Sequence, residues 1–200
     1  MVALPENTRE LPPEVVALLP EQGHWSERDY LWLTSRTNRL VELVDGRIEV
    51  LHPPTDRHQA VLQAVFVLLR DFVRARGGVA RFSPLRVRTV PGHVREPDVV
   101  MLFSSADPRR HDECWDGADL VVEVVGADDP KRDTVEKREE YARAGFCEYW
   151  VVNPLTESVT VLRLEGGSYM EHGCFRRGQQ ASSPSMAGFA ASVDAILDAP

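Results

Sequence analysis

One short apolar run with a charge inside it constrains this chain more than any other feature. Residues 119–125 read DLVVEVV, and Glu123 sits among five Leu and Val residues. That β-branched content is typical of a strand buried in the middle of a sheet. A carboxylate in such a strand costs several kcal/mol unless a cation, a proton or a metal compensates it. The run therefore predicts a central strand and marks Glu123 as a candidate functional residue.

The segment after this strand predicts a helix over residues 133–144. Asp133, with Glu136 three residues later, fits a capping box, which predicts where the helix begins. Asp133, Lys137 and Tyr141 are spaced by four residues, so they share one face of this helix. The helix is expected to pack back over the strand that carries Glu123.

The rest of the chain predicts an α+β domain with a mixed sheet flanked by helices. Strands are expected at 39–44, 47–51, 79–82, 85–90, 97–103, 148–152, 157–164 and 169–175. Further helices are expected at 27–36, 57–76 and 193–197. Polar connections are expected at 104–117 and 181–188. Four Pro residues in 1–25 indicate an N-terminal arm, which leaves 26–200 as a single domain.

Composition excludes some classes of protein. No apolar run approaches the length of a membrane span, and the N-terminus does not resemble a signal peptide. The three Cys residues show no C-x-x-C spacing, which fits a reducing cytoplasm and argues against a disulfide framework or zinc site. The net charge of −8 does not indicate a nucleic-acid-binding protein, although an acidic chain can still carry a local basic patch. Only two of the 23 basic residues are Lys, which draws attention to Lys137.

A second acidic residue occupies another apolar strand. Asp98 lies near the start of the run at 97–103. If this strand neighbours the one at 119–125, Asp98 and Glu123 meet, and a cation between them relieves their repulsion. Carboxylate oxygens with water are the ligands that Mg²⁺ prefers, and Mn²⁺ often substitutes. Lys137 is placed to point its ammonium group at the same location.

The order of several short motifs resembles a known family. Pro97-Asp98 followed by Glu123 is the skeleton of the PD-(D/E)xK nuclease superfamily. From about Tyr30 to the C-terminus, the wider pattern is similar to the Uma-type "putative restriction endonuclease" family. The motifs that carry this resemblance are ELVDG at 42–46, PP with a His-Gln pair at 53–59, PD at 97–98, DLVVEVV at 119–125, D-x-x-x-K at 133–137, YARAG at 141–145 and EYWVVNP at 148–154.

This resemblance implies a restriction-endonuclease-like fold, binding of Mg²⁺ or Mn²⁺, and hydrolysis of DNA phosphodiester bonds. The resemblance implies that Asp98 and Glu123 are metal ligands. It also implies that the backbone carbonyl of Val124 is the third ligand that the protein gives to the metal. The usual Lys position of the superfamily holds Val125 here. Lys137 on the next helix is therefore expected to take that role, orienting the attacking water and stabilising developing charge.

Three further residues match the family pattern. Glu42 matches an upstream acid that binds or positions a second metal or a water. His58 matches a His at the start of the long helix and is expected at the site or at a phosphate. Tyr141 is expected to contact substrate. The loop at 126–129 and Arg47 depart from the pattern. Because cleavage of both DNA strands needs two sites, a homodimer is also expected.

Each candidate also has an ordinary structural explanation. Asp98 can cap a strand, and Glu123 can pair with an Arg of the long helix. Lys137 can pair with Asp133 on the helix surface. Glu42 can be a strand residue that faces water, His58 can be an ordinary helix-start residue, and Tyr141 can be a core aromatic residue. Two other functions stay open: a non-catalytic nucleic-acid-binding or assembly module that keeps the fold, and a small-molecule or protein-interaction domain, which fits the acidic charge.

Overall fold

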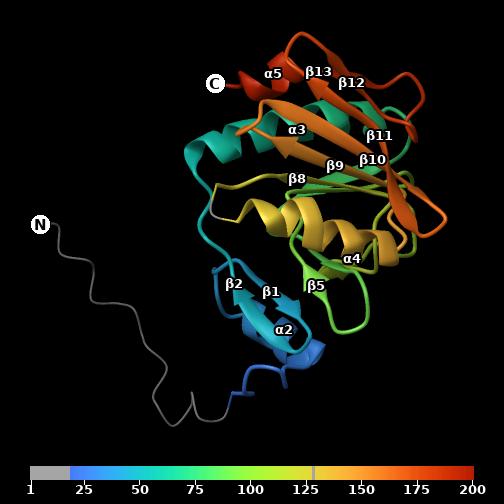
Figure 1. Ribbon diagram of the computed structural model, residues 1–200. Helices are drawn as coiled ribbons and strands as arrows, with labels where there is room; N and C mark the ends of the chain where they lie inside the picture. The colour runs from blue at the N-terminus through green and yellow to red at the C-terminus, as the bar shows by residue number, and fades with distance from the viewer. Residues whose placement is uncertain (1–18, 128) are drawn as a thin grey trace, which may run out of the picture.

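A mixed β-sheet forms the centre of the molecule (Figure 1). The computed structural model describes residues 19–127 and 129–200. Within these residues the sheet has six strands in the order β11-β10-β9-β8-β6-β3. β8 and β9 run parallel, and the other neighbouring strands are antiparallel. The strands are β3 (Val79–Phe82), β6 (Val99–Leu102), β8 (Leu120–Val124), β9 (Glu148–Asn153), β10 (Ser158–Glu165) and β11 (Ser168–Arg176).

Helices cover both faces of this sheet, as Figure 1 shows. They are α3 (Asp56–Arg74), the π-helical turn η1 (Arg132–Glu136), α4 (Lys137–Arg143) and α5 (Val193–Leu197). On one face α3 buries Val61, Val65 and Leu69 against Val99 and Val122 of the sheet, and α5 joins the same core. On the other face the buried residues of α4 pack against the alternate side chains of the strands. The expected mixed sheet flanked by helices is confirmed.

In the view of Figure 1, a second, smaller sheet lies below the first. Among the described residues it has five strands in the order β2-β1-β5-β4-β7. They are β1 (Val41–Val44), β2 (Arg47–Val50), β4 (Arg86–Arg88), β5 (Val94–Arg95) and β7 (Cys114–Trp115), and α2 (Glu27–Thr34) packs against them. A two-stranded ribbon of β12 (Gln180–Ser182) and β13 (Ala190–Ser192) adds to the α3 side of the main sheet.

Local sequence signals explain where several elements begin and turn. Ser26 forms a capping box with Asp29 at the start of α2, and the Thr55 hydroxyl accepts the His58 N–H at the start of α3. Asp45 and Gly46 both have positive φ, which a two-residue hairpin turn between β1 and β2 requires. A Cβ on Gly46 would lie 2.6 Å from the Gly23 carbonyl oxygen, so only Gly fits there.

Three boundary predictions are wrong. Asp133 does not cap a helix, because the chain is already helical at residue 130 and Asp133 lies inside η1, so its side chain is free to bind Lys137. The connection at 104–117 contains β7, and the loop at 181–188 begins inside β12. These strands have only two and three residues, too few for an alternation pattern to appear.

The expected N-terminal arm is only partly visible. Residues 1–18 lie outside the described residues. Residues 19–25 pack on the domain, since Trp25 is buried and both Gly23 and Trp25 donate backbone hydrogen bonds to the Gly46 carbonyl.

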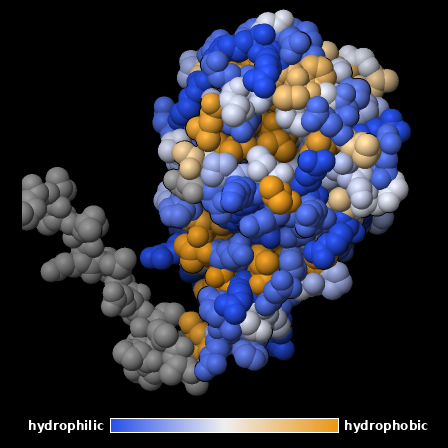
Figure 2. Space-filling model, in the orientation of Figure 1, coloured by the Kyte–Doolittle hydropathy of each residue, from blue (hydrophilic) through white to orange (hydrophobic). Residues whose placement is uncertain are grey.

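The face of the molecule shown in Figure 2 is mostly hydrophilic. On the face in Figure 2, hydrophobic residues form small groups separated by hydrophilic ones. No helix in the described ranges combines the length and the apolar composition needed to cross a membrane.

Candidate active site

The pairing of β6 with β8 places the two acidic residues side by side. Val99 pairs with Val122 in antiparallel register. Asp98 and Glu123 therefore occupy the next position on neighbouring strands, where side chains leave the same face of a sheet. The expected adjacency of these two strands is confirmed, and both carboxylates line one pocket.

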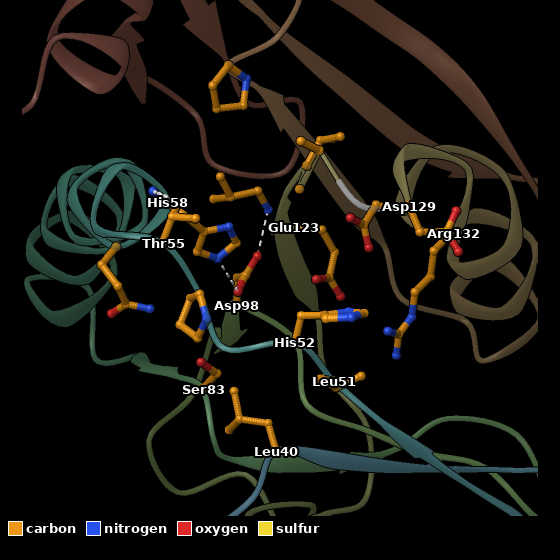
Figure 3. A pocket seen from close by; sticks show the side chains of 18 of the residues that line it. Leu40, Leu51, His52, Thr55, His58, Ser83, Asp98, Glu123, Asp129 and Arg132 are labelled. Atoms are coloured by element: carbon orange, nitrogen blue, oxygen red, sulfur yellow. Dashed lines mark hydrogen bonds and ion pairs between the residues drawn. The ribbon is translucent and has the colours of Figure 1, made fainter. Parts of the chain in front are cut away.

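Asp98 is oriented by two partners (Figure 3). Its Oδ2 accepts the Val124 N–H at 2.7 Å, and its Oδ1 lies 3.1 Å from Nε2 of His58. His58 reaches it from the first turn of α3. Burial lowers the pKa of His58, but the hydrogen bond and charge of Asp98 outweigh burial, so the pKa is raised. The contacts with His58 and with the Val124 N–H together fix the Asp98 carboxylate in one orientation.

Glu123 is buried and short of positive charge. Its Oε1 lies 2.8 Å from Nζ of Lys137 and accepts the Tyr141 hydroxyl at 2.5 Å. Burial raises the pKa of Glu123, and the nearby carboxylates of Asp133 and Asp98 raise it further, against the opposing effect of Lys137. The ordinary explanation, a partner Arg from the long helix, is wrong, because the cation comes from α4.

Lys137 is the ammonium group at this site. Besides Glu123, its Nζ lies 3.3 Å from Oδ1 of Asp133 and 3.8 Å from Oε1 of Glu42. Burial alone lowers the pKa of Lys137, but Glu123, Glu42 and Asp133 together outweigh burial and raise the pKa. The side chain is 4 % exposed, so it is a buried cation and not a solvated helix residue.

Glu42 belongs to an ion-pair cluster behind the pocket, here called the sealed cluster because Glu42, Arg95 and Glu140 are at most 4 % exposed; its fourth member, Arg132, reaches the pocket wall. One of its oxygens pairs with Nη1 of Arg95 at 2.8 Å and with Arg132, and the other accepts the Glu96 N–H at 3.0 Å. Arg95 continues the cluster to Glu140 at 2.6 Å. Glu42 is 0 % exposed, so the alternative in which it faces water is wrong. Burial raises the pKa of Glu42, but Lys137, Arg95 and Arg132 outweigh burial and lower the pKa.

The pocket gathers most of the predicted site residues. It has a volume of about 280 Å³, and its walls include Asp98, Glu123, Val124, Lys137 and His58. The other two predicted residues are not among its lining residues. Glu42 instead forms ion pairs with Arg95 and Arg132. Tyr141 is fully buried and directs its hydroxyl at Glu123, so it supports that carboxylate from below and offers no surface to a substrate.

The donor set fits a hard divalent cation held largely by water. Among the described residues no group of three or more His, Cys, Asp or Glu side chains is arranged to hold a metal. A site here rests on Asp98 and Glu123 with the Val124 carbonyl. Mg²⁺ is commonly bound through one or two carboxylates while it keeps several waters. Burial and the neighbouring carboxylates of Asp133 and Asp98 raise the pKa of Glu123, and a cation in the pocket would oppose both effects.

Two arginines of the site were missed by sequence reasoning. Arg132 lines the pocket, and Arg95 is 3 % exposed within the sealed cluster. A signal was present for Arg95, because it lies directly between apolar Val94 and Glu96-Pro97-Asp98, where a charged residue needs a buried partner. Arg132 gave no signal, since it lies in a charged stretch that resembles an exposed helix start.

The architecture and the pocket define a class of protein. A mixed sheet with helices on both faces and two acids from neighbouring strands are features of the restriction-endonuclease-like fold, and here the Lys comes from the next helix in place of position 125. The Uma2 family, described as "Putative restriction endonuclease", matches residues 27–194, and the chain belongs to this family. The family resemblance of the motifs is thereby confirmed.

A solved structure shows the same fold. The crystal structure of a protein titled "a putative nuclease belonging to DUF820", from Anabaena variabilis, is similar with a TM-score of 0.69 at 19 % sequence identity. The similarity covers 81 % of this chain and 92 % of that chain. No curated protein sequence matches this chain.

Proposed function

We propose that this chain is a metal-dependent endonuclease that hydrolyses DNA phosphodiester bonds. The observation that carries the proposal is the convergence of Asp98, Glu123 and Lys137 at one pocket, with Nζ of Lys137 2.8 Å from Glu123 Oε1. Membership of the Uma2 family supports a nuclease, and DNA is the substrate of restriction endonucleases.

Asp98, Glu123 and the carbonyl of Val124 are the groups proposed to hold Mg²⁺, or Mn²⁺ in its place. An ion bound there would polarise the phosphate and lower the pKa of a coordinated water. His58 serves this site by fixing the orientation of Asp98 through the 3.1 Å contact.

Lys137 provides the protein's own electrostatic contribution. Its ammonium group is held in place by Glu123 and Asp133, so no reorganisation is needed when charge builds up on the phosphate oxygens. In the reaction the oxygen of water bonds to phosphorus and one phosphorus–oxygen ester bond breaks, with the proton passing to the departing alkoxide. Glu42, 3.8 Å from Nζ, is proposed to help keep Lys137 charged and in position.

A cleavage assay on two circular substrates tests this proposal. Supercoiled plasmid and circular single-stranded DNA are incubated with the protein in Mg²⁺, in Mn²⁺ and in EDTA. We expect metal-dependent nicking or linearisation of at least one substrate and none in EDTA. Intact circles of both kinds in both metals would refute the nuclease proposal and favour the non-catalytic nucleic-acid-binding or assembly module.

Two further expectations from the sequence, a homodimer and a cytoplasmic location, stay predictions. The described chain offers one such pocket, and cutting both strands of a duplex at one place needs two, which is the reason for expecting a homodimer. Light scattering of the purified protein tests that state. The cytoplasmic location rests on the spacing of the Cys residues alone.

A further inference from the structure

The groups proposed to act on the phosphate are recessed. Glu123 is 3 % exposed and Lys137 is 4 % exposed, and both line the pocket of about 280 Å³. A group so deeply placed contacts only what enters the pocket. The phosphates of a continuous duplex lie on the convex surface of a stiff rod, whereas a single strand can bend locally to insert one nucleotide.

Apolar residues form part of the pocket wall, and such a surface suits a sugar and a base better than a phosphate. Leu40, Leu51, Pro53 and Pro54 contribute apolar surface, and Leu155 does so after the end of β9. Figure 3 shows Leu40 and Leu51 along the pocket beside His52. Two consecutive prolines fix their φ angles, so this wall is stiff. An apolar, preformed wall next to a cationic and acidic centre is the combination that holds a small ligand in one orientation.

An exposed aromatic residue lies close to the pocket along the chain, on the face of the main sheet that α3 covers. Phe82 directly precedes Ser83, which lines the pocket, and is 50 % exposed at the outer edge of the main sheet. Its ring is held edge-on by Phe66, with centroids 4.8 Å apart, and the Arg70 guanidinium lies 5.6 Å from the Phe66 ring. An oriented, half-exposed ring is a surface on which unpaired bases stack, and the Arg70 guanidinium contacts the supporting Phe66 ring.

We infer that the pocket admits one unpaired nucleotide, with its base and sugar on the apolar wall and the next base stacked on Phe82. Substrates with unpaired nucleotides, such as single strands and overhangs, are then preferred over continuous duplex. This inference rests on the proposed nuclease function for its reaction, but the binding preference stands by itself. A single strand needs only one active site, so this preference does not require a second copy of the chain.

Three labelled DNA substrates of the same sequence test the preference: a single strand, a blunt duplex and a duplex with a single-stranded overhang. Cleavage is followed in Mg²⁺ and Mn²⁺, and binding is followed by fluorescence anisotropy in Ca²⁺. We expect the single strand and the overhang to be cut and bound at least about tenfold better than the blunt duplex.

The outcomes separate the two proposals. Single-strand preference in binding without cleavage of any substrate would refute the nuclease function and support the inference. Equal or better cutting and binding of the blunt duplex would overturn the inference and leave the nuclease function intact. Absence of both cutting and binding would overturn both.

Two variants and a matched control locate the contacts. Phe82→Leu keeps apolar packing against Phe66 but loses the stacking ring, and Leu155→Ala trims the pocket wall. Met170→Ala is the control, because Met170 and Leu155 are both 56 % exposed and Met170 lies on β11 at the opposite edge of the sheet from Phe82.

The first two variants are expected to raise the KM, and the Kd in Ca²⁺, for the single strand by about tenfold, with kcat unchanged. Met170→Ala is expected to change neither, and urea midpoints check that all three variants fold. Single-strand affinity unchanged in both Phe82→Leu and Leu155→Ala would overturn the assignment of these contacts.

Discussion

Glu42 and Glu123 are equally removed from water, yet their environments shift their pKa values in opposite directions. Glu42 has two arginines, Lys137 and a backbone N–H around it, and its pKa is lowered. Glu123 has Lys137 as its direct cation and has Asp98 and Asp133 nearby, and its pKa is raised. Burial penalises both carboxylates, so the count of neighbouring charges decides the direction.

This difference separates a structural cluster from the proposed active site. In the cluster of Glu42, Arg95, Arg132 and Glu140 both buried carboxylates pair with an arginine, and the cluster joins the small sheet to α4. The pocket cluster of Asp98, Glu123, Asp133, His58 and Lys137 holds more acids than bases and opens to solvent. An acid-rich cluster at a pocket has room for an added cation, whereas the buried carboxylates of the sealed cluster already hold arginines.

Removing the central cation of the sealed cluster is expected to have the largest effect. Arg95→Met leaves Glu42 and Glu140 without their main partner, and breaking a buried ion pair from one side typically costs about 3–5 kcal/mol of unfolding free energy. Urea denaturation measures this loss. Arg163→Met is the control, since the exposed pair of Arg163 with Glu165 is worth at most about 1 kcal/mol. Equal losses in both variants would contradict the structural role of the sealed cluster.

Removing the cation of the pocket is expected to lower stability as well as catalysis, because Lys137 is the direct buried partner of Glu123. Lys137→Met is expected to lower kcat by about 100-fold or more, because a preorganised charge at the phosphate is lost. Lys131→Met is the matched control, because Lys131 is the other Lys of the chain and is exposed. Circular dichroism and urea midpoints confirm folding. Cleavage by Lys137→Met at the rate of Lys131→Met would remove Lys137 from the mechanism.

The two glutamates are expected to give opposite pH dependences of stability in EDTA. The folded-state pKa of Glu123 lies above its ordinary value of 4.5, so the folded state binds more protons and its stability falls as pH rises above 4.5. The folded-state pKa of Glu42 lies below 4.5, so its stabilisation is present above that pH and is lost as pH falls. Each slope is at most about 1.4 kcal/mol per pH unit.

Glu123→Gln and Glu42→Gln remove these slopes one at a time. Urea unfolding from pH 3 to 8 compares each variant with the parent chain. The unfolding free energy of Glu123→Gln, minus that of the parent chain, should increase as pH rises. Glu42→Gln should be less stable than the parent chain above pH 4.5, and this deficit should shrink as pH falls. Slopes of the same sign for both variants would show that the two environments do not differ as described.

Much of the fold was predictable because its signals are local and strong. DLVVEVV predicts β8 through its apolar run, and Asp45-Gly46 predicts the hairpin of β1 and β2 through its turn chemistry. Caps and periodicity predict α3. The short strands β7, β12 and β13 were not predictable, because their pairing comes from tertiary contacts and not from pattern.

The candidate site was predictable only in its outline. Glu123 stands out because a charge interrupts an apolar strand, and the family pattern adds Asp98 and Lys137. The sealed environment of Glu42 was not predictable, because its partners Arg95 and Arg132 lie 53 and 90 residues further along the chain. Long-range ion pairs leave no periodic signal in a sequence.

A calorimetric titration with Mn²⁺ tests the central claim most directly, namely that the pocket cluster accepts a cation and the sealed cluster does not. The titration compares the parent chain with Asp98→Asn and with Glu49→Gln, whose carboxylate lies at the rim of the sealed cluster and does not line the pocket. We predict saturable Mn²⁺ binding in the parent chain and in Glu49→Gln, and its loss in Asp98→Asn. Binding that is absent from the parent chain, or unchanged in Asp98→Asn, would contradict the account.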